Sequence, residues 1–169
     1  MRFAIREARL ADVDAICRAH AASWQDSYRG ILPGDVIDRA DVGHRAMSRR
    51  RLLADPELLT LVAYDTTHGD IVGLCDAGPA RRPGRWAGEI YALYLVAHAK
   101  RYGLGSDLFD ATCRWLRASN TRSLVIWVLD NNPHAHRFYE AMGGRVAARI
   151  QSAIAGFPIV ERAYVWDAI

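Results

Sequence analysis

The sequence has few cysteines, and their number and spacing argue against a fold built on disulfides. Cys17, Cys75 and Cys113 are odd in number, widely separated, and each lies in an apolar stretch. Free cysteine in such a setting usually behaves as a small buried hydrophobe. No nearby pattern supplies the base and oxyanion site that a catalytic thiol needs. We therefore expect three buried free thiols.

Long apolar runs and a strong charge of one sign are also missing. No stretch approaches the roughly 20 apolar residues of a membrane-spanning helix. The N-terminal segment MRFAIREARLADVD carries charges throughout and has no apolar signal core. We expect a cytoplasmic protein without a membrane partner. The net charge of only +3 disfavours nucleic acid as a partner, and the basic run Arg49-Arg50-Arg51 predicts a solvated helix face.

What remains has the composition of an ordinary globular domain. Of the 169 residues, 51% are hydrophobic and 24% are charged. A chain of this length buries enough surface to fold without disulfides or metal. No repeat, low-complexity segment or linker divides it, so residues 1–169 are predicted to form a single domain. We expect no metal, because His134 and His136 lack partners at metal-ligand spacing.

Hydrophobic periodicity predicts strands and helices that alternate along the chain. We expect Asp12 or Asp14 to cap the first helix, and Asn132-Pro133 to open the last one. The expected strands cover residues 2–8, 58–64, 71–77, 89–96, 123–129, 145–152 and 157–167. The expected helices run from Asp12 to a break at residues 28–34, from about 35 to 53, from 103 to 118, and from 132 to Gly143-Gly144. This order predicts an α/β (α+β) fold with one mixed sheet and helices on both faces.

The segment Lys100-Arg101-Tyr102-Gly103-Leu104-Gly105 lies between a buried strand and a helix. Free amides at a helix N-terminus, with glycines that let the backbone curl, suit a phosphorylated ligand. A tight turn with no ligand is the alternative. A dinucleotide-binding loop is disfavoured, because Leu108 stands where its third glycine belongs.

Two motifs in register give the chain a resemblance to the GCN5-related N-acetyltransferase (GNAT) family. That family has a strand, [QR]-x-x-G-x-[GA], a helix, a second strand, and N-x-x-A-x-x-x-Y-x-x-x-G. Here KRYGLG follows the strand EIYALYLV, and NPHAHRFYEAMG follows SLVIWVLD. Lys100 stands where glutamine or arginine is usual, Arg101 where glycine is common, and Ala97 where proline is common. The resemblance covers about residues 3–168.

The resemblance implies a mostly antiparallel sheet of about seven strands that is splayed between strands 4 and 5. It implies acetyl-CoA as co-substrate, with its pantetheine arm paired to the backbone of Leu93, Tyr94 and Leu95. The pyrophosphate would be held by the amides of Arg101, Tyr102, Gly103, Leu104, Gly105 and Ser106. Lys100 and Arg101 are cations placed for phosphate oxygens. Asn132 resembles the asparagine that contacts pantetheine, a role compatible with a plain helix cap.

The resemblance also implies direct attack by an amine within a ternary complex. Tyr139 matches the tyrosine that protonates the departing thiolate; a core tyrosine is the alternative. Glu89, which alternation places on the face of Tyr91 and Leu93, matches a common base, while an edge residue or a charge partner for the substrate is the alternative.

The acceptor pocket is expected to involve Trp24, Tyr28 and Tyr91, although Trp24 and Tyr28 suit the core equally well. The acceptor itself stays open between a small-molecule amine and a peptide N-terminus. A homodimer is left open. The alternatives to an acetyltransferase are a non-catalytic acyl-CoA sensor and a transferase for another acyl group.

Overall fold

The computed structural model describes residues 2–40 and 45–169, which contain seven strands and five α-helices. The strands are β1 (Phe3–Glu7), β2 (Leu59–Asp65), β3 (Ile71–Pro79), β4 (Gly88–Leu95), β5 (Leu124–Leu129), β6 (Arg145–Ile154) and β7 (Phe157–Trp166). The helices are α1 (Val13–Tyr28), α2 (Gly34–Ala40), α3 (Arg45–Ala54), α4 (Leu104–Ala118) and α5 (Pro133–Ala141). Two short 3₁₀ turns, η1 (Leu10–Asp12) and η2 (Ala97–Ala99), precede α1 and α4.

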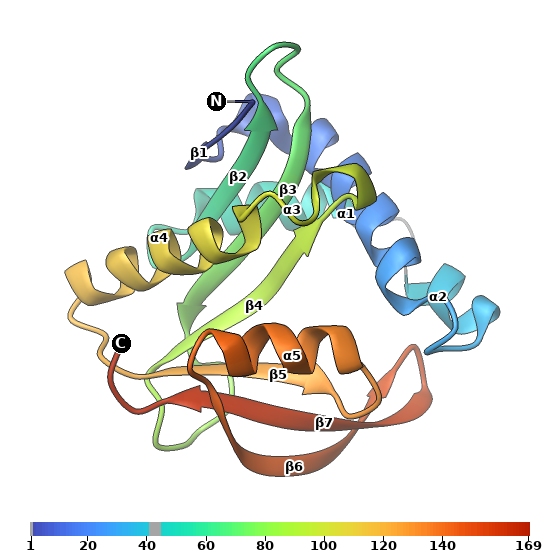
Figure 1. Cartoon of the computed structure of the whole chain (residues 1–169), viewed down its shortest axis with the longest axis vertical. Helices are drawn as coiled ribbons and strands as arrows, with labels where there is room; N and C mark the ends of the chain where they lie inside the picture. The colour runs from blue at the N-terminus through green and yellow to red at the C-terminus, as the bar shows by residue number, and fades with distance from the viewer. Residues whose placement is uncertain (1, 41–44) are drawn as a thin grey trace.

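All seven strands form one mixed sheet in the order β1-β2-β3-β4-β5-β7-β6. Every neighbouring pair is antiparallel except β4 and β5, which are parallel. That parallel pair is short, because only Gly88 with Leu124 and Glu89 with Val125 are in register. Beyond Glu89 the two strands diverge, which is visible in the middle of Figure 1. The predicted splayed α/β fold is confirmed.

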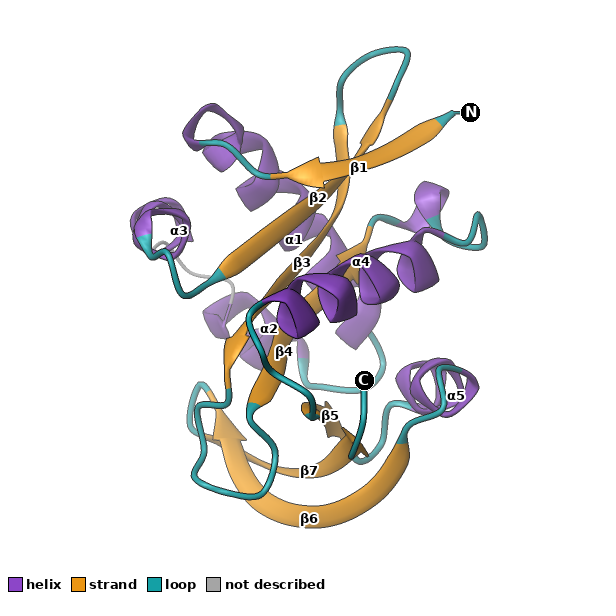
Figure 2. Cartoon of the chain, turned by 90° about the vertical axis from the view of Figure 1, so that its left-hand side faces the viewer, coloured by secondary structure: helices purple, strands orange, loops and turns teal. Residues whose placement is uncertain are grey.

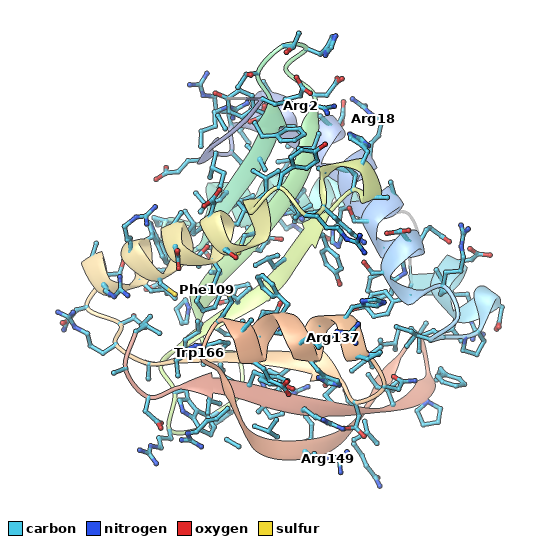
Figure 3. The ribbon with its side chains drawn as sticks, in the orientation of Figure 1. Arg2, Arg18, Phe109, Arg137, Arg149 and Trp166 are labelled. Atoms are coloured by element: carbon cyan, nitrogen blue, oxygen red, sulfur yellow. The ribbon has the colours of Figure 1, made fainter. Side chains whose placement is uncertain are left out.

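Helices cover both faces of the sheet (Figures 1 and 2). Buried side chains of α4, among them Leu108 and Leu116, join β2 and β3 in the largest core cluster. Ile16 and Ala19 of α1 pack on the opposite face against Val62 and other β2 and β3 residues. Helix α4 also contacts the second half of the sheet, since the rings of Phe109 in α4 and Trp166 in β7 lie 5.0 Å apart (Figure 3).

Strand β4 contains an irregularity that the sequence pattern did not predict. Ile90 and Ala92 pair with consecutive residues of β3, which leaves Tyr91 without a partner in that strand. An extra residue of this kind is a β-bulge and reverses the alternation of side chains. Ile90 therefore shares the cluster beneath α4 with Leu93, and Glu89 points to the other face. The prediction that Glu89 shares a face with Leu93 is wrong for this reason.

Three further predictions need correction around the first helices. The expected helix from 35 to 53 is α2 and α3, and its residues 41–44 lie outside the described residues. The carboxylate of Asp12 makes no cap bond to α1; it accepts hydrogen bonds from the Arg6 guanidinium at 2.6 Å and from the backbone N–H of Arg9 at 2.7 Å. Cys17 is half-buried, whereas Cys75 and Cys113 are buried as expected, and none of the three forms a disulfide bond within the described residues.

The basic run of α3 is not uniformly solvated. Arg49 is buried, and its Nη1 lies 2.5 Å from the buried carboxylate of Asp76 in β3. Thr60 donates its hydroxyl to the same carboxylate at 2.7 Å. Arg50 and Arg51 are exposed. The prediction is therefore wrong for Arg49, which fastens α3 to the sheet through a buried ion pair. No helix in the described part of the chain has the length and apolarity needed to cross a membrane.

Candidate active site

The gap between β4 and β5 exposes a free strand edge. Leu93, Tyr94 and Leu95 pair on one side with Cys75, Leu74 and Gly73 of β3. On the other side, no strand among residues 2–40 and 45–169 pairs with them. The backbone N–H and C=O groups that point away from β3 on such an edge are a template for an extended, amide-containing ligand. The three residues whose backbone is predicted to pair with a pantetheine arm thus lie on an open strand edge.

The loop after β4 and the first turn of α4 carry a row of unpaired backbone amides. Among the described residues, the backbone N–H groups from Arg101 to Ser106 have no hydrogen-bond acceptor. Gly103 turns the chain into the helix with φ +81°, and Arg101 also has a positive φ of 68°. Consecutive amides beside a helix N-terminus form a site for an anion, because the macrodipole adds to their partial positive charge.

Gly105 lies in the first turn of α4 and faces α5. A β-carbon at this position would lie 3.2 Å from the ring of Phe138 and 3.8 Å from a methyl group of Leu95. The absence of a side chain therefore lets the first turn of α4 approach α5 and the end of β4 closely. This requirement is a packing one, since Gly105 lies inside the helix, whereas Gly103 is needed for its backbone angle.

The two loop cations predicted to meet phosphate differ in the structure. The ammonium group of Lys100 lies 2.5 Å from the carboxylate of Asp26 in α1. The guanidinium of Arg101 is exposed and has no carboxylate partner within the described residues. Arg101 is consequently the cation that remains unpaired, while Lys100 links the loop to α1.

Asn132 occupies the N-cap of α5. Its Oδ1 accepts a hydrogen bond from the backbone N–H of Ala135 at 3.2 Å, and the side chain is buried. No acceptor for its Nδ2 occurs among the described residues. The capping role is therefore present, and the amide nitrogen is left for a ligand.

Tyr139 lies on the inner face of α5 and is 7% exposed. Its ring lies 5.1 Å from Phe138, 5.9 Å from Tyr164 and 6.3 Å from Trp166. Burial, with smaller contributions from Cys75 and Tyr28, raises the pKa of Tyr139 well above its usual range. The phenol therefore stays protonated at neutral pH and is suited to donate a proton.

Glu89 lies at the last paired position before β4 leaves β5, and it is 1% exposed. Its carboxylate accepts three hydrogen bonds from Arg81: from the backbone N–H at 2.8 Å, from Nε at 3.1 Å and from Nη2 at 2.5 Å. A buried carboxylate requires such partners. Arg81 thus holds Glu89, and sequence reasoning did not foresee this pair.

The predicted acceptor residues form two separate groups. Trp24 and Tyr28 share a face of α1, with ring centroids 4.3 Å apart. The Tyr28 hydroxyl lies 3.1 Å from that of Tyr94, and burial raises the pKa of Tyr28. Tyr91 instead donates its hydroxyl to the carbonyl of Pro79 at 2.5 Å. Burial, followed by the charge of Glu89, raises the pKa of Tyr91 to about 12.

A groove of about 410 Å³ opens above Glu89, and we call it the arginine groove. One wall carries Arg81 and Arg82 from the loop between β3 and β4. The hairpin of β6 and β7 supplies the remaining lining residues, which are Ser152, Ala153, Ile154, Ile159 and Glu161. The sequence signal for this groove is the loop PARRPGRWAG, which carries three arginines and no acidic residue.

Comparison with known proteins agrees with this arrangement. The acetyltransferase (GNAT) family matches residues 15–144. The uncharacterized N-acetyltransferase YuaI of Bacillus subtilis is 29% identical over 96% of this chain and 91% of that protein. The PaiA N-acetyltransferase of Thermoplasma acidophilum, solved in complex with coenzyme A, has a TM-score of 0.75 at 18% identity, covering 96% of this chain and 98% of that one.

A second solved structure is an N-acetyltransferase from Staphylococcus aureus Mu50, with a TM-score of 0.74 at 17% identity over 99% of both chains. The matched segment contains the free edge of β4, the amide loop and the Asn132–Gly143 motif. On these grounds the chain belongs to the acetyltransferase (GNAT) family.

Proposed function

We propose that this GNAT N-acetyltransferase transfers an acetyl group from acetyl-CoA to an amine by direct attack within a ternary complex. The observation that carries the proposal is the row of free amides from Arg101 to Ser106, which directly follows the free edge of β4. A pyrophosphate and an amide-containing arm are the groups that these two features suit. The similar PaiA structure contains coenzyme A, which supports the same assignment.

In this proposal the loop amides and Arg101 hold the pyrophosphate, and the backbone of Leu93 to Leu95 pairs with the pantetheine arm. The Nδ2 of Asn132 donates to a carbonyl of that arm. When bound, acetyl-CoA supplies an activated acetyl group as a thioester. Residues 1–169 act as one domain in this proposal.

Proton movement is assigned to two side chains. Tyr139 donates the proton of its hydroxyl to the departing thiolate, since a phenol is protonated at neutral pH; the pKa that burial raises makes it a weak acid for this step. Glu89 accepts the proton that the amine loses, through a water molecule. The three hydrogen bonds from Arg81 take two lone-pair sites of Oε1 and one of Oε2, so one site on Oε2 is left to receive that proton.

The roles of Glu89 and Arg81 are separable by comparing two variants. If Glu89 accepts the proton, Glu89→Gln lowers kcat by at least about a hundredfold, while Arg81→Gln lowers it much less. If the two residues only hold the loop in place, both variants lose activity to a similar extent. Equal losses would therefore remove Glu89 as the base.

The function is tested by following the release of free CoA thiol with a panel of small amines, amino acids and peptides. We expect thiol release that depends on one class of amine. Acetyl-CoA binding without thiol release for any amine would indicate a sensor and contradict the proposal. Parallel assays with propionyl-CoA test the acyl group.

A further inference from the structure

The loop between β3 and β4, residues 79–88, brings a concentration of positive charge to the acceptor side of the site. Its sequence PARRPGRWAG has Arg81, Arg82 and Arg85 and no acidic residue. Arg81 and Arg82 line the arginine groove, whose floor is Glu89. Arg85 points elsewhere and lies 3.5 Å from Asp167, near the end of β7.

Arg81 and Arg82 line this groove together with Glu89 and Glu161, and the arginine side chains are the more exposed. The side chain of Arg81 is 62% exposed, whereas its partner Glu89 is 1% exposed. The side chain of Arg82 is 43% exposed, whereas its partner Glu161 is 17% exposed, at a distance of 3.0 Å. The arginine of each ion pair is therefore the partner that a ligand reaches more easily.

Both guanidinium groups are held in place before any ligand arrives. Arg81 lies over the ring of Tyr91 at 4.5 Å, and Arg82 lies over the ring of Trp127 at 4.4 Å. A cation fixed between an aromatic ring and a carboxylate loses little freedom on binding. The Nη1 of Arg81 and the Nε and Nη1 of Arg82 have no acceptor among the described residues, so these N–H groups are left for an anion.

The position of the groove places an anion bound by the arginines close to the amine that is to be acetylated. Glu89, at the point where β4 leaves β5, is bonded directly to Arg81. An amine that passes its proton towards Glu89 would therefore lie close to these guanidinium groups. The opposite wall is partly apolar, since it includes Ala153, Ile154 and Ile159. A volume of about 410 Å³ lies within the range of small-molecule sites.

We propose that the acceptor is a small amine with a carboxylate close to its amino group and an apolar side chain, in the manner of an α-amino acid. Arg82, assisted by Arg81, binds the carboxylate, and the β6–β7 hairpin contacts the side chain. This inference rests on the proposed acetyl transfer and names the substrate class for that site. A planar guanidinium suits a carboxylate, because it offers two parallel N–H donors.

The test compares matched pairs of acceptors with the 169-residue chain. Initial rates of CoA thiol release are measured for leucine, methionine and phenylalanine and for the corresponding amino acid amides. We expect kcat/KM for the best acid to exceed that for its amide by about tenfold or more, the usual effect of a charge-assisted hydrogen bond. This preference opposes the intrinsic reactivity of the acceptors. The α-amino group of an amino acid amide is less protonated at neutral pH than that of the acid, so more of it is free to attack.

Variants connect the preference to the groove. Arg82→Gln is expected to lower the acid-to-amide ratio of kcat/KM about tenfold, and Arg85→Gln, from the same loop but outside the groove, to leave the ratio unchanged. Because the ratio is measured within one variant, a partial loss of folded enzyme cancels.

Two results would overturn the inference while the transferase function stands. One is efficient acetylation of amines that have no carboxylate next to the amino group, such as the amides, diamines or peptides, at rates equal to or above those of the acids. The other is an acid-to-amide ratio that Arg82→Gln does not change. If no amine of any class releases thiol, the proposed transferase function fails first.

Discussion

Removal of a single hydroxyl group, by Tyr139→Phe, separates catalysis from stability in this protein. The Tyr139 ring packs among Phe138, Tyr164 and Trp166, and phenylalanine fills the same space. Within the described residues the hydroxyl has no hydrogen-bond partner. Loss of a hydroxyl that makes no bond changes the free energy of unfolding by less than about 1 kcal/mol. We expect the midpoint of thermal unfolding to stay within a few degrees of the wild type.

The expected effect on turnover is much larger. A positioned general acid contributes a factor of about 10²–10⁴ in rate. Because burial raises the pKa of Tyr139 well above its usual range, the phenol is a weak acid, and we expect the lower end, about a hundredfold in kcat. That factor corresponds to about 2.7 kcal/mol in activation free energy. The affinity for acetyl-CoA is expected to change by less than about threefold, since the amide loop and the β4 edge remain intact.

The assay combines three measurements on wild type and variant. CoA thiol release at saturating acetyl-CoA and acceptor gives kcat, calorimetric titration gives the acetyl-CoA affinity, and a thermal melt gives stability. Equal kcat values would remove Tyr139 as the acid. A loss of kcat that comes with an equally large loss of acetyl-CoA affinity or of stability would show that the hydroxyl acts through structure, which would also refute the reasoning.

Three further outcomes are expected. Gly105→Val should weaken acetyl-CoA binding at least tenfold by calorimetry, because even a β-carbon would lie 3.2 Å from a ring of α5; unchanged binding in a folded variant would contradict the site. Arg49→Met should lower the free energy of unfolding by about 3–5 kcal/mol in a denaturant titration, because it leaves a buried carboxylate unpaired, whereas the exposed Arg50→Met should leave it nearly unchanged. The hydrogen bond from Arg6 lowers the pKa of Asp12 in the folded protein. The ionised carboxylate therefore stabilises the fold above its unfolded pKa, and this contribution is lost as the pH falls through the lowered pKa. The difference in the free energy of unfolding between wild type and Asp12→Asn should shrink below about pH 4, and a difference that stays constant with pH would contradict this.

The order of strands and helices was predictable because it depends on neighbouring residues. Apolar spacing marks α4 and α5, and continuous apolar runs mark β4 and β5. The bulge at Tyr91 was not predictable, since nothing in the apolar run EIYALYLV marks the extra residue. That one residue decides the face on which Glu89 lies. Pattern reasoning assumes an uninterrupted pleat, and pairing with β3 is what interrupts it.

The charged residues show the same limit more strongly. Arg49, Arg50 and Arg51 read as one basic run, yet only Arg49 meets a buried carboxylate, 27 residues away along the chain. Lys100 was expected to face a phosphate, and it is paired with Asp26, 74 residues away. A local sequence pattern indicates that a side chain is charged, and it does not indicate which residue the side chain contacts. Its partner depends on which elements the fold packs together.

The sequence by itself determined the half of the site that we propose for the cofactor. The loop from Lys100 to Gly105 and the motif from Asn132 to Gly143 are contiguous, and their role depends on backbone amides and helix ends that neighbouring residues define. Only the tertiary structure decided the half that we propose for the acceptor. It folded the loop of residues 79–88 over Glu89, paired two acids with two arginines, and set the β6–β7 hairpin opposite them. Those contacts join segments that are separate in the chain, so no local pattern could report them.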